Sequence, residues 1–258
     1  MSSHPSLPRR FAVLAYGVVS YAIFFATFLY ACGFVGGFVV PKSIDSAVTA
    51  PVWTALVVNA GLLAVFALQH SVMARPWFKR RLTRHIPQAA ERSTYTLLSS
   101  LALIALFVFW QPMGGIVWQV GNPTGRALLY GGFAFGWLLV LGTTFLLNHF
   151  DLFGLRQVWL YFVGRPYTPL KFATPGPYKL VRHPLYVGWF FSFWCTPTMT
   201  AAHLFFAVMT TVYILVAIQL EERDLEEFHP EYRDYKRRTP MLVPRLGSDV
   251  EPVRQTVD

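Results

Sequence analysis

Side chains able to bind an anion gather in one short segment of the C-terminal third of this 258-residue chain. The segment runs from Gly176 to Gly188, and it places Arg182 and His183 directly before Pro184 and an apolar run. Proline suits the first turn of a helix, whose free N–H groups favour an anionic group such as a carboxylate. The segment therefore predicts a helix start that binds an anionic part of a ligand.

A second segment is rich in carboxylates. Seven of the 13 acidic residues lie between positions 221 and 234, immediately after the last apolar run. The stretch from Glu221 to Phe228 predicts a helix, and Glu221 and Glu222 directly follow Leu220, at or just under a membrane surface. Acids at that depth are costly and usually functional. Tyr232 and Tyr235 add an aromatic helical face after them.

The elements that must position these side chains are six apolar stretches. They are roughly Phe11 to Val40, Pro51 to Ala74, Thr94 to Trp110, Ala127 to Leu147, Leu185 to Pro197 and Ala201 to Leu220. If each stretch carries the chain to the membrane's other side, with the last two forming one hairpin, the loops on one side hold all of the 22 lysines and arginines except Lys42 and Arg126. The positive-inside rule then places both termini and the active site in the cytoplasm.

Leu185 to Pro197 gives only about 20 Å of helix at 1.5 Å per residue, too short for a complete span. We expect it to be one arm of a membrane hairpin that turns at Cys195 to Thr200 and returns at Glu221. This hairpin brings Arg182 and His183 next to Glu221 and Glu222.

The expected fold is an all-α polytopic membrane protein with four transmembrane helices and this C-terminal hairpin, five to six membrane segments in all. Residues 1–148 form the transmembrane part and 149–258 the ligand-binding part of one integrated domain, and Ser248 to Asp258 reads as a disordered tail.

The composition excludes several classes of protein. With 54% hydrophobic and 14% charged residues and a mean hydropathy of +0.42, the chain is an integral membrane protein. A net charge of +9 would suggest nucleic acid in a soluble chain, but here the excess faces anionic lipid headgroups. We expect membrane lipid as a partner, no nucleic acid and no metal centre; the oligomeric state stays open.

The two charged segments together suit a zwitterionic ligand. A helix start with arginine fits a carboxylate, glutamates fit an amine and ribose hydroxyls, and tyrosines fit an adenine or a sulfonium.

At these residues the sequence resembles the isoprenylcysteine carboxyl methyltransferase family. The matching blocks are Arg182 to Gly188, with the pattern Arg-His-Pro-x-Tyr-x-Gly, and Glu221 to Pro244, with Glu-Glu-x-x-Leu and a tyrosine-rich tail. The resemblance implies that S-adenosyl-L-methionine binds on the cytoplasmic face. Its implied binding residues are Tyr178, Arg182, His183, Leu185, Tyr186, Gly188, Glu221, Glu222, Tyr232 and Tyr235.

The upstream half narrows the resemblance. Phe66 to Arg75 and Asn148 to Trp159 look like NnrU-type membrane proteins, and within them like the bacterial methanethiol S-methyltransferases. That likeness implies methylation of a small volatile thiol in the inner membrane: methanethiol to dimethyl sulfide and, in some members, hydrogen sulfide to methanethiol. The choice between methanethiol, sulfide and a larger thiol stays open.

Methyl transfer to a thiol requires the thiolate, so a group must take the thiol proton. Candidates are His70, near the end of the second apolar stretch, Glu231 with Arg237 in the C-terminal tail, and His149 with Asp151, which could form an imidazole and carboxylate pair. By family likeness, Glu231 and Arg237 lie near the transferred methyl group.

Two alternatives remain open at this stage. One keeps the cofactor and changes the methyl acceptor to a prenylcysteine carboxylate or a phospholipid amine. The other is a haem-binding isomerase of the NnrU type, in which His70 and His149 serve as axial ligands.

Overall fold

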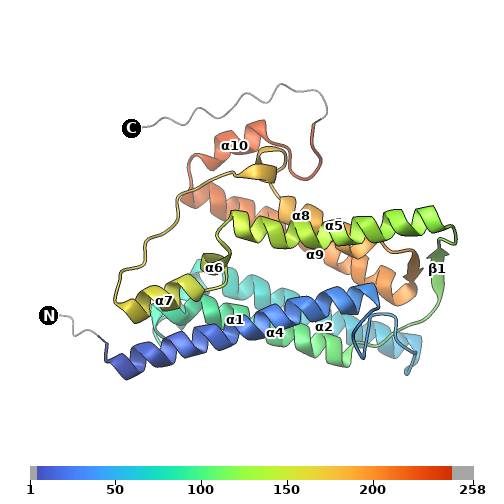
Figure 1. Ribbon diagram of the computed structural model, residues 1–258, viewed down its shortest axis with the longest axis horizontal. Helices are drawn as coiled ribbons and strands as arrows, with labels where there is room; N and C mark the ends of the chain where they lie inside the picture. The colour runs from blue at the N-terminus through green and yellow to red at the C-terminus, as the bar shows by residue number, and fades with distance from the viewer. Residues whose placement is uncertain (1–4, 246–258) are drawn as a thin grey trace.

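The helices lie in two groups that run lengthwise beside each other (Figure 1). The computed structural model describes residues 5–245, so the tail expected at Ser248 to Asp258 lies outside the described residues. One group packs α1 against α4 and α7, and α2 against α4; the other packs α5 against α8, and α8 against α9. The helices and strands are α1 (Leu7–Gly36), α2 (Val52–Ala74), α3 (Pro76–Leu82), η1 (Gln88–Ala90), α4 (Glu91–Phe109), β1 (Ile116–Gln119), α5 (Pro123–Leu146), α6 (His149–Leu152), α7 (Leu155–Val163), η2 (Gly176–Lys179), α8 (Pro184–Trp194), β2 (Thr198–Thr200), α9 (Ala201–Phe228) and α10 (Tyr232–Arg238).

Among the described residues, five helices are long and apolar enough to cross a membrane: α1, α2, α4 with the preceding η1, α5 and α9. The predicted polytopic, helical membrane fold is therefore confirmed. Most side chains on the outer faces of these helices are exposed and apolar, as lipid contact requires.

An aromatic core joins the two groups of helices. Trp110 of α4 is fully buried and meets Phe206 of α9 edge to face, with ring centroids 5.8 Å apart. Phe28 of α1 meets Trp137 of α5 in the same way at 5.3 Å. Described residues before and after position 148 thus contribute to one core.

The short apolar stretch forms α8, whose 11 residues begin at Pro184 with His183 as the N-cap residue. The predicted hairpin is present, and its turn contains a strand that the sequence did not predict: β2 pairs antiparallel with β1, which precedes α5. The hairpin's second arm, α9, continues without a break from the membrane segment through Glu221 to Phe228. The predicted helix after Leu220 is therefore the end of a membrane helix.

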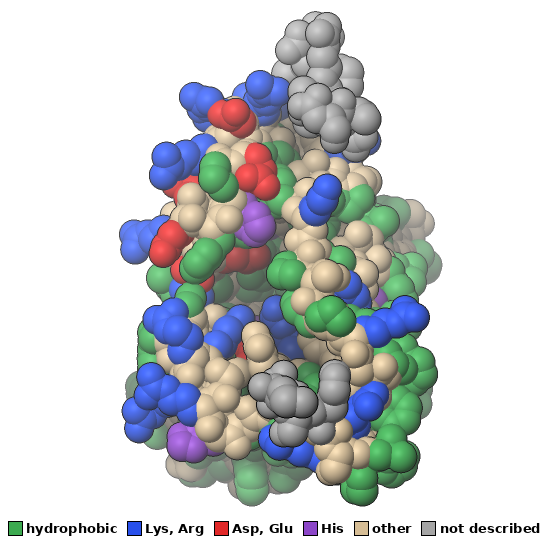
Figure 2. All heavy atoms as spheres, turned by 90° about the vertical axis from the view of Figure 1, so that its left-hand side faces the viewer, with side chains coloured by type: hydrophobic (Ala, Val, Ile, Leu, Met, Phe, Trp, Pro, Cys, Tyr) green, Lys and Arg blue, Asp and Glu red, His purple; other side chains and the backbone are tan. Residues whose placement is uncertain are grey.

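Basic side chains gather at one end of the molecule, where α1 begins and α2, α5 and α9 end (Figure 2). We call this the basic end. Lys42 follows α1 and bonds to the Val108 carbonyl at the end of α4, and Arg126 lies in the first turn of α5. Both therefore lie at the opposite end, as predicted.

The tightest helix contact is between α5 and α8, where two glycines allow backbone approach. A Cβ atom on Gly136 would lie 2.6 Å from the Ser192 nitrogen and 2.7 Å from the Gly188 carbonyl oxygen. Because backbone atoms cannot move aside cheaply, this contact fixes where α8 begins, and with it Arg182 and His183.

We expect Gly136→Ala to destabilise the protein by about 1 to 3 kcal/mol through overpacking. Thermal unfolding in detergent measures the effect as a lower melting temperature. Gly131→Ala on the same helix is the matched control, because nothing lies within 4 Å of its added Cβ. Equal melting temperatures for the two variants would contradict the proposed packing constraint.

Candidate functional site

A buried carboxylate organises the basic end. Oε1 of Glu222 accepts hydrogen bonds from Nε of Arg182 at 2.8 Å and from Nε2 of His183 at 3.0 Å. Oε2 forms an ion pair with Nζ of Lys236 at 2.9 Å. The side chains of Arg182 and Glu222 are only 10% and 4% exposed. We call these four residues the clasp, and its existence confirms that the hairpin brings the two charged segments together.

The clasp also holds the chain that follows α10. Nη1 of Arg182 donates to the carbonyl oxygens of Lys236 at 3.1 Å and Thr239 at 2.6 Å. The backbone N–H of Arg182 donates to the carbonyl of Pro240 at 2.8 Å. The hydrogen bonds that Lys236 donates to Glu226 and Glu222 raise its pKa, so this amine stays charged. Arg182 therefore ties the start of α8 to the C-terminal end of α10.

Aromatic rings form one wall beside the clasp. The Tyr235 hydroxyl donates to the carbonyl of Tyr178 at 2.6 Å, which links α10 to η2. Phe172, from the loop before η2, lies edge-on to Tyr232 and Tyr235 with centroids 6.0 and 5.8 Å away. Burial raises the pKa of both Tyr178 and Tyr235, so their phenols stay neutral. Tyr232 is buried in this wall, whereas Tyr178 and Tyr235 are half-buried.

Glu221 differs from its neighbour Glu222 because its side chain is exposed. Its Oε2 accepts a hydrogen bond from the Tyr186 hydroxyl at 2.9 Å. The surface of the basic end is hollowed between the α10 side and the α1 side, with acidic side chains on the wall of the hollow (Figure 2). A carboxylate held by one phenol at such a place can accept further hydrogen bonds from a ligand.

Two other predicted binding residues on α8 have different surroundings. Gly188 is buried in the contact with α5, where a Cβ would lie 2.8 Å from a methyl group of Val140. Leu185 is half-buried on the first turn of the helix. Gly188, two residues after Tyr186, thus positions α8 through packing.

His149 and Asp151 are both buried, but they do not form the imidazole and carboxylate pair considered above. The His149 nitrogens bond to the Tyr21 hydroxyl and the Thr144 hydroxyl, each at 2.8 Å. Asp151 pairs with Arg156, with Oδ1 and Nη1 2.7 Å apart. Burial lowers the pKa of His149, which keeps the ring neutral. Their polar atoms are already satisfied by neighbouring residues.

The remaining predicted residues lie apart from one another. His70 lies in α2 and bonds to Tyr95 and Ser99 of α4. Glu231 is the N-cap residue of α10, and Arg237 lies in its last turn. Their side chains are 55% and 78% exposed. They are the most solvent-accessible of the predicted residues.

Several residues of this region were missed by sequence reasoning. Lys236 lies four residues after Tyr232, so helical spacing could have placed both on the face toward Glu222. Phe172 lies in an irregular loop, and Tyr95 and Tyr213 lie inside apolar helices. No local pattern marks these three residues.

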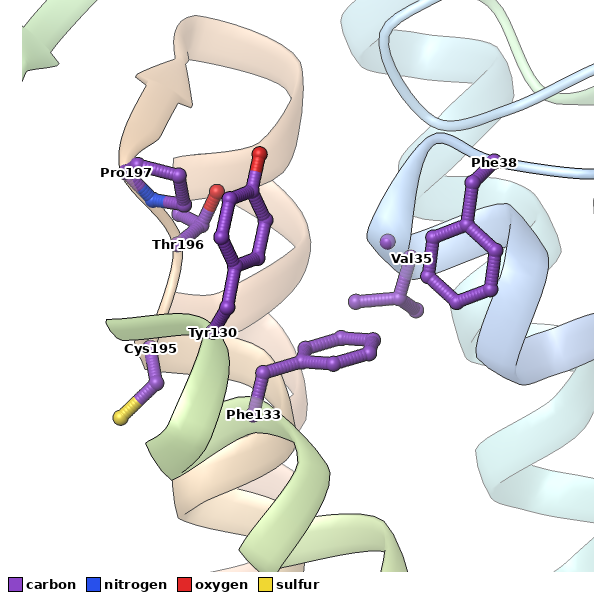
Figure 3. Close-up of a pocket in the computed structure, with 8 residues that line it drawn as sticks. Val35, Phe38, Tyr130, Phe133, Cys195, Thr196 and Pro197 are labelled. Carbon is purple, nitrogen blue, oxygen red and sulfur yellow. The ribbon is translucent and has the colours of Figure 1, made fainter. Parts of the chain in front are cut away.

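The opposite end holds a small cavity of about 20 Å³, room for about one water molecule. Figure 3 shows Tyr130, Phe133 and Cys195 around it, together with Val35 and Phe38. Its lining carries no carboxylate, histidine, lysine or arginine.

Known proteins resemble this chain over nearly its whole length. A methanethiol S-methyltransferase of Crocosphaera subtropica is 57% identical over 246 residues, covering 95% of this chain and 96% of the relative. One from Mycobacterium tuberculosis is 51% identical, covering 92% and 97%. Nurim from Xenopus laevis is 26% identical over 87% of this chain and 86% of its own. No family model and no solved structure matches the chain.

We expect Glu222→Gln to lower the free energy of unfolding by about 3 kcal/mol, because it leaves the buried Arg182 without its counter-charge. Hydrogen exchange of the α10 amides measures the loosening directly. Glu227→Gln, an exposed position on the same helix, is the control. Unchanged protection of α10 in Glu222→Gln would show that the clasp does not hold this helix.

Proposed function

Because the chain belongs to the methanethiol S-methyltransferase family, we propose that this membrane enzyme methylates methanethiol to dimethyl sulfide with S-adenosyl-L-methionine as methyl donor. Identity of about half over more than nine-tenths of each chain is the observation that carries the methanethiol assignment. The relatives named for this thiol favour it over a prenylcysteine carboxylate or a phospholipid amine as acceptor.

The side chains at the basic end support the choice of S-adenosyl-L-methionine as methyl donor. S-adenosyl-L-methionine supplies an electrophilic methyl group on a positively charged sulfur. The exposed Glu221 carboxylate, held by Tyr186, suits its amine or ribose hydroxyls, and the Tyr178 and Tyr235 rings suit its adenine. The residues present therefore fit this cofactor.

Within this proposal, the residues of the clasp act indirectly. Both oxygens of Glu222 already bond to Arg182, His183 and Lys236, so we assign Glu222 to positioning rather than to direct ligand contact. The clasp holds η2, α8 and α10 at fixed relative positions around Glu221. Preorganisation of this kind is what an in-line displacement needs most, since alignment supplies much of its rate.

We assign the basic end to the cytoplasmic side of the inner membrane on the positive-inside rule. The cofactor is then bound from the cytoplasm. Glu231 and Arg237, exposed near the clasp, stay candidates for contacts to the donor near its transferred methyl group.

The haem-binding alternative receives no support from the histidine geometry. Both nitrogens of His149 and both nitrogens of His70 already bond to hydroxyl groups. An axial ligand needs one nitrogen free for the iron.

Membranes containing the protein are expected to form dimethyl sulfide from methanethiol and S-adenosyl-L-methionine, measured by headspace gas chromatography. Membranes with the empty vector are the control. If no dimethyl sulfide exceeds that control, the proposed substrate is wrong.

Glu221→Gln is expected to weaken S-adenosylhomocysteine binding about 10-fold, since it removes one charge-assisted hydrogen bond to the ligand. Calorimetry on the purified protein gives the affinity. The matched control is Glu227→Gln, which removes an exposed carboxylate further along α9. This variant should bind S-adenosylhomocysteine like the wild type. Equal affinities of both variants would remove Glu221 from the binding site.

A further inference from the structure

A second polar cluster lies deeper in the molecule, in the membrane-spanning part. His70 of α2 bonds through Nε2 to the Tyr95 hydroxyl at 2.7 Å and through Nδ1 to the Ser99 hydroxyl at 3.2 Å. Next to His70, the Ser71 hydroxyl bonds to the Tyr213 hydroxyl of α9 at 3.2 Å. Polar groups at this depth are costly, and a histidine among them is by default a functional hypothesis.

The cluster is compact and has an apolar side. The Phe66 ring stacks on His70 at 5.2 Å and meets Tyr213 edge-on at 6.3 Å. His70, Tyr95 and Tyr213 are each half-buried, so part of each side chain is accessible to a small molecule. We call the partly exposed surface of Phe66, His70, Tyr95 and Tyr213, where α2, α4 and α9 meet, the crevice.

The crevice adjoins the proposed cofactor site along α9. Glu221, which accepts from the Tyr186 hydroxyl, lies on α9 between Tyr213, which bonds to Ser71 of α2, and Asp224, which pairs with Arg75 of α2. The charged groups that act electrostatically on Tyr95 are Arg92, Glu221 and Glu91. At the basic end, an ion pair between Arg75 and Asp224 ties α2 to α9 with a 3.0 Å contact. A ligand at Glu221 thus has the crevice as its neighbour on the membrane side.

The hydrogen bonds suit proton transfer. In the neutral His70 ring that donates Nδ1–H to Ser99, the Nε2 lone pair accepts the hydrogen bond of the Tyr95 hydroxyl. A phenol in this position can receive one proton on its oxygen while it passes its own to the imidazole. This tautomer is the one that the relay requires, since both partners are hydroxyls that can donate or accept.

We propose that the crevice binds the acceptor thiol and that Tyr95 relays the thiol proton to Nε2 of His70; this inference rests on the proposed function. The S–H bond breaks, and its proton passes through the Tyr95 oxygen to His70. The thiolate sulfur bonds to the methyl carbon of the sulfonium donor, whose own bond to that carbon breaks and leaves its electrons on the donor sulfur. His70 afterwards returns one proton to solvent.

The chemistry of the crevice matches a small, lipid-soluble thiol. Phe66 offers an apolar contact for its methyl group, and the hydroxyl of Tyr95 accepts its S–H. Such a molecule partitions into the bilayer and reaches the crevice from between the helices, while the charged donor binds from the basic end. The two substrates thus arrive from different phases.

Tyr95→Phe in the full-length protein tests the relay through two measurements: the rate of dimethyl sulfide formation across a range of pH, and S-adenosylhomocysteine affinity. We expect the rate at neutral pH to fall by about 100-fold, a typical contribution of proton transfer, while the affinity stays unchanged. The defect should narrow as the pH rises, because thiol already ionised in solution needs no relay. His70→Gln should show the same pattern.

Tyr30→Phe is the matched control, since the Tyr30 hydroxyl donates to the Lys42 carbonyl at the opposite end. It loses one tyrosine hydroxyl outside the crevice and should keep the wild-type rate. A wild-type rate in Tyr95→Phe, or an equal fractional loss at every pH, would overturn the relay. Loss of S-adenosylhomocysteine binding in both crevice variants would assign the pair to folding and would also overturn it. An inactive wild type would instead overturn the proposed function.

Discussion

The ion pair between Glu222 and Arg182 is the interaction on which the basic end depends. A carboxylate that is 4% exposed carries a large desolvation cost, and only close opposite charges and complete hydrogen bonding offset it. Three side chains meet that requirement together. Arg182 and His183 come from the residues just before α8, and Lys236 comes from α10. Because removal of any partner leaves a buried charge, the positions of η2, α8 and α10 are coupled.

The two adjacent carboxylates that follow the last apolar run have different roles. Glu222 bonds to other residues of the protein, and Glu221 remains accessible to a ligand. Helix geometry explains the difference, since consecutive residues point about 100° apart on an α-helix. Glu222 faces the clasp, and Glu221 is exposed beside Tyr186.

The sequence was sufficient for the membrane helices, the hairpin and the meeting of the two charged segments, because hydropathy, loop charge and proline placement are local signals. The β1–β2 pair was not predictable, since Ile116–Gln119 pairs with residues about 80 positions further along. The partners of Asp151 and His149 were also missed. Tyr21 reaches His149 from α1 through tertiary packing. Thr144 and Arg156 lie five residues from their partners, but across the ends of α5 and α6, where no helical spacing predicts the contact.

Because α9 is one uninterrupted helix from Ala201 to Phe228, it fixes the distance between the residues that it carries. Tyr213 and Glu221 are eight residues apart, so their backbones are separated by about 12 Å along the axis, a length that cannot adjust without breaking helical hydrogen bonds. Selectivity between acceptors then becomes a question of molecular length. A compact molecule is accommodated within that fixed interval, whereas an acceptor with a long chain would have to extend past it into the lipid.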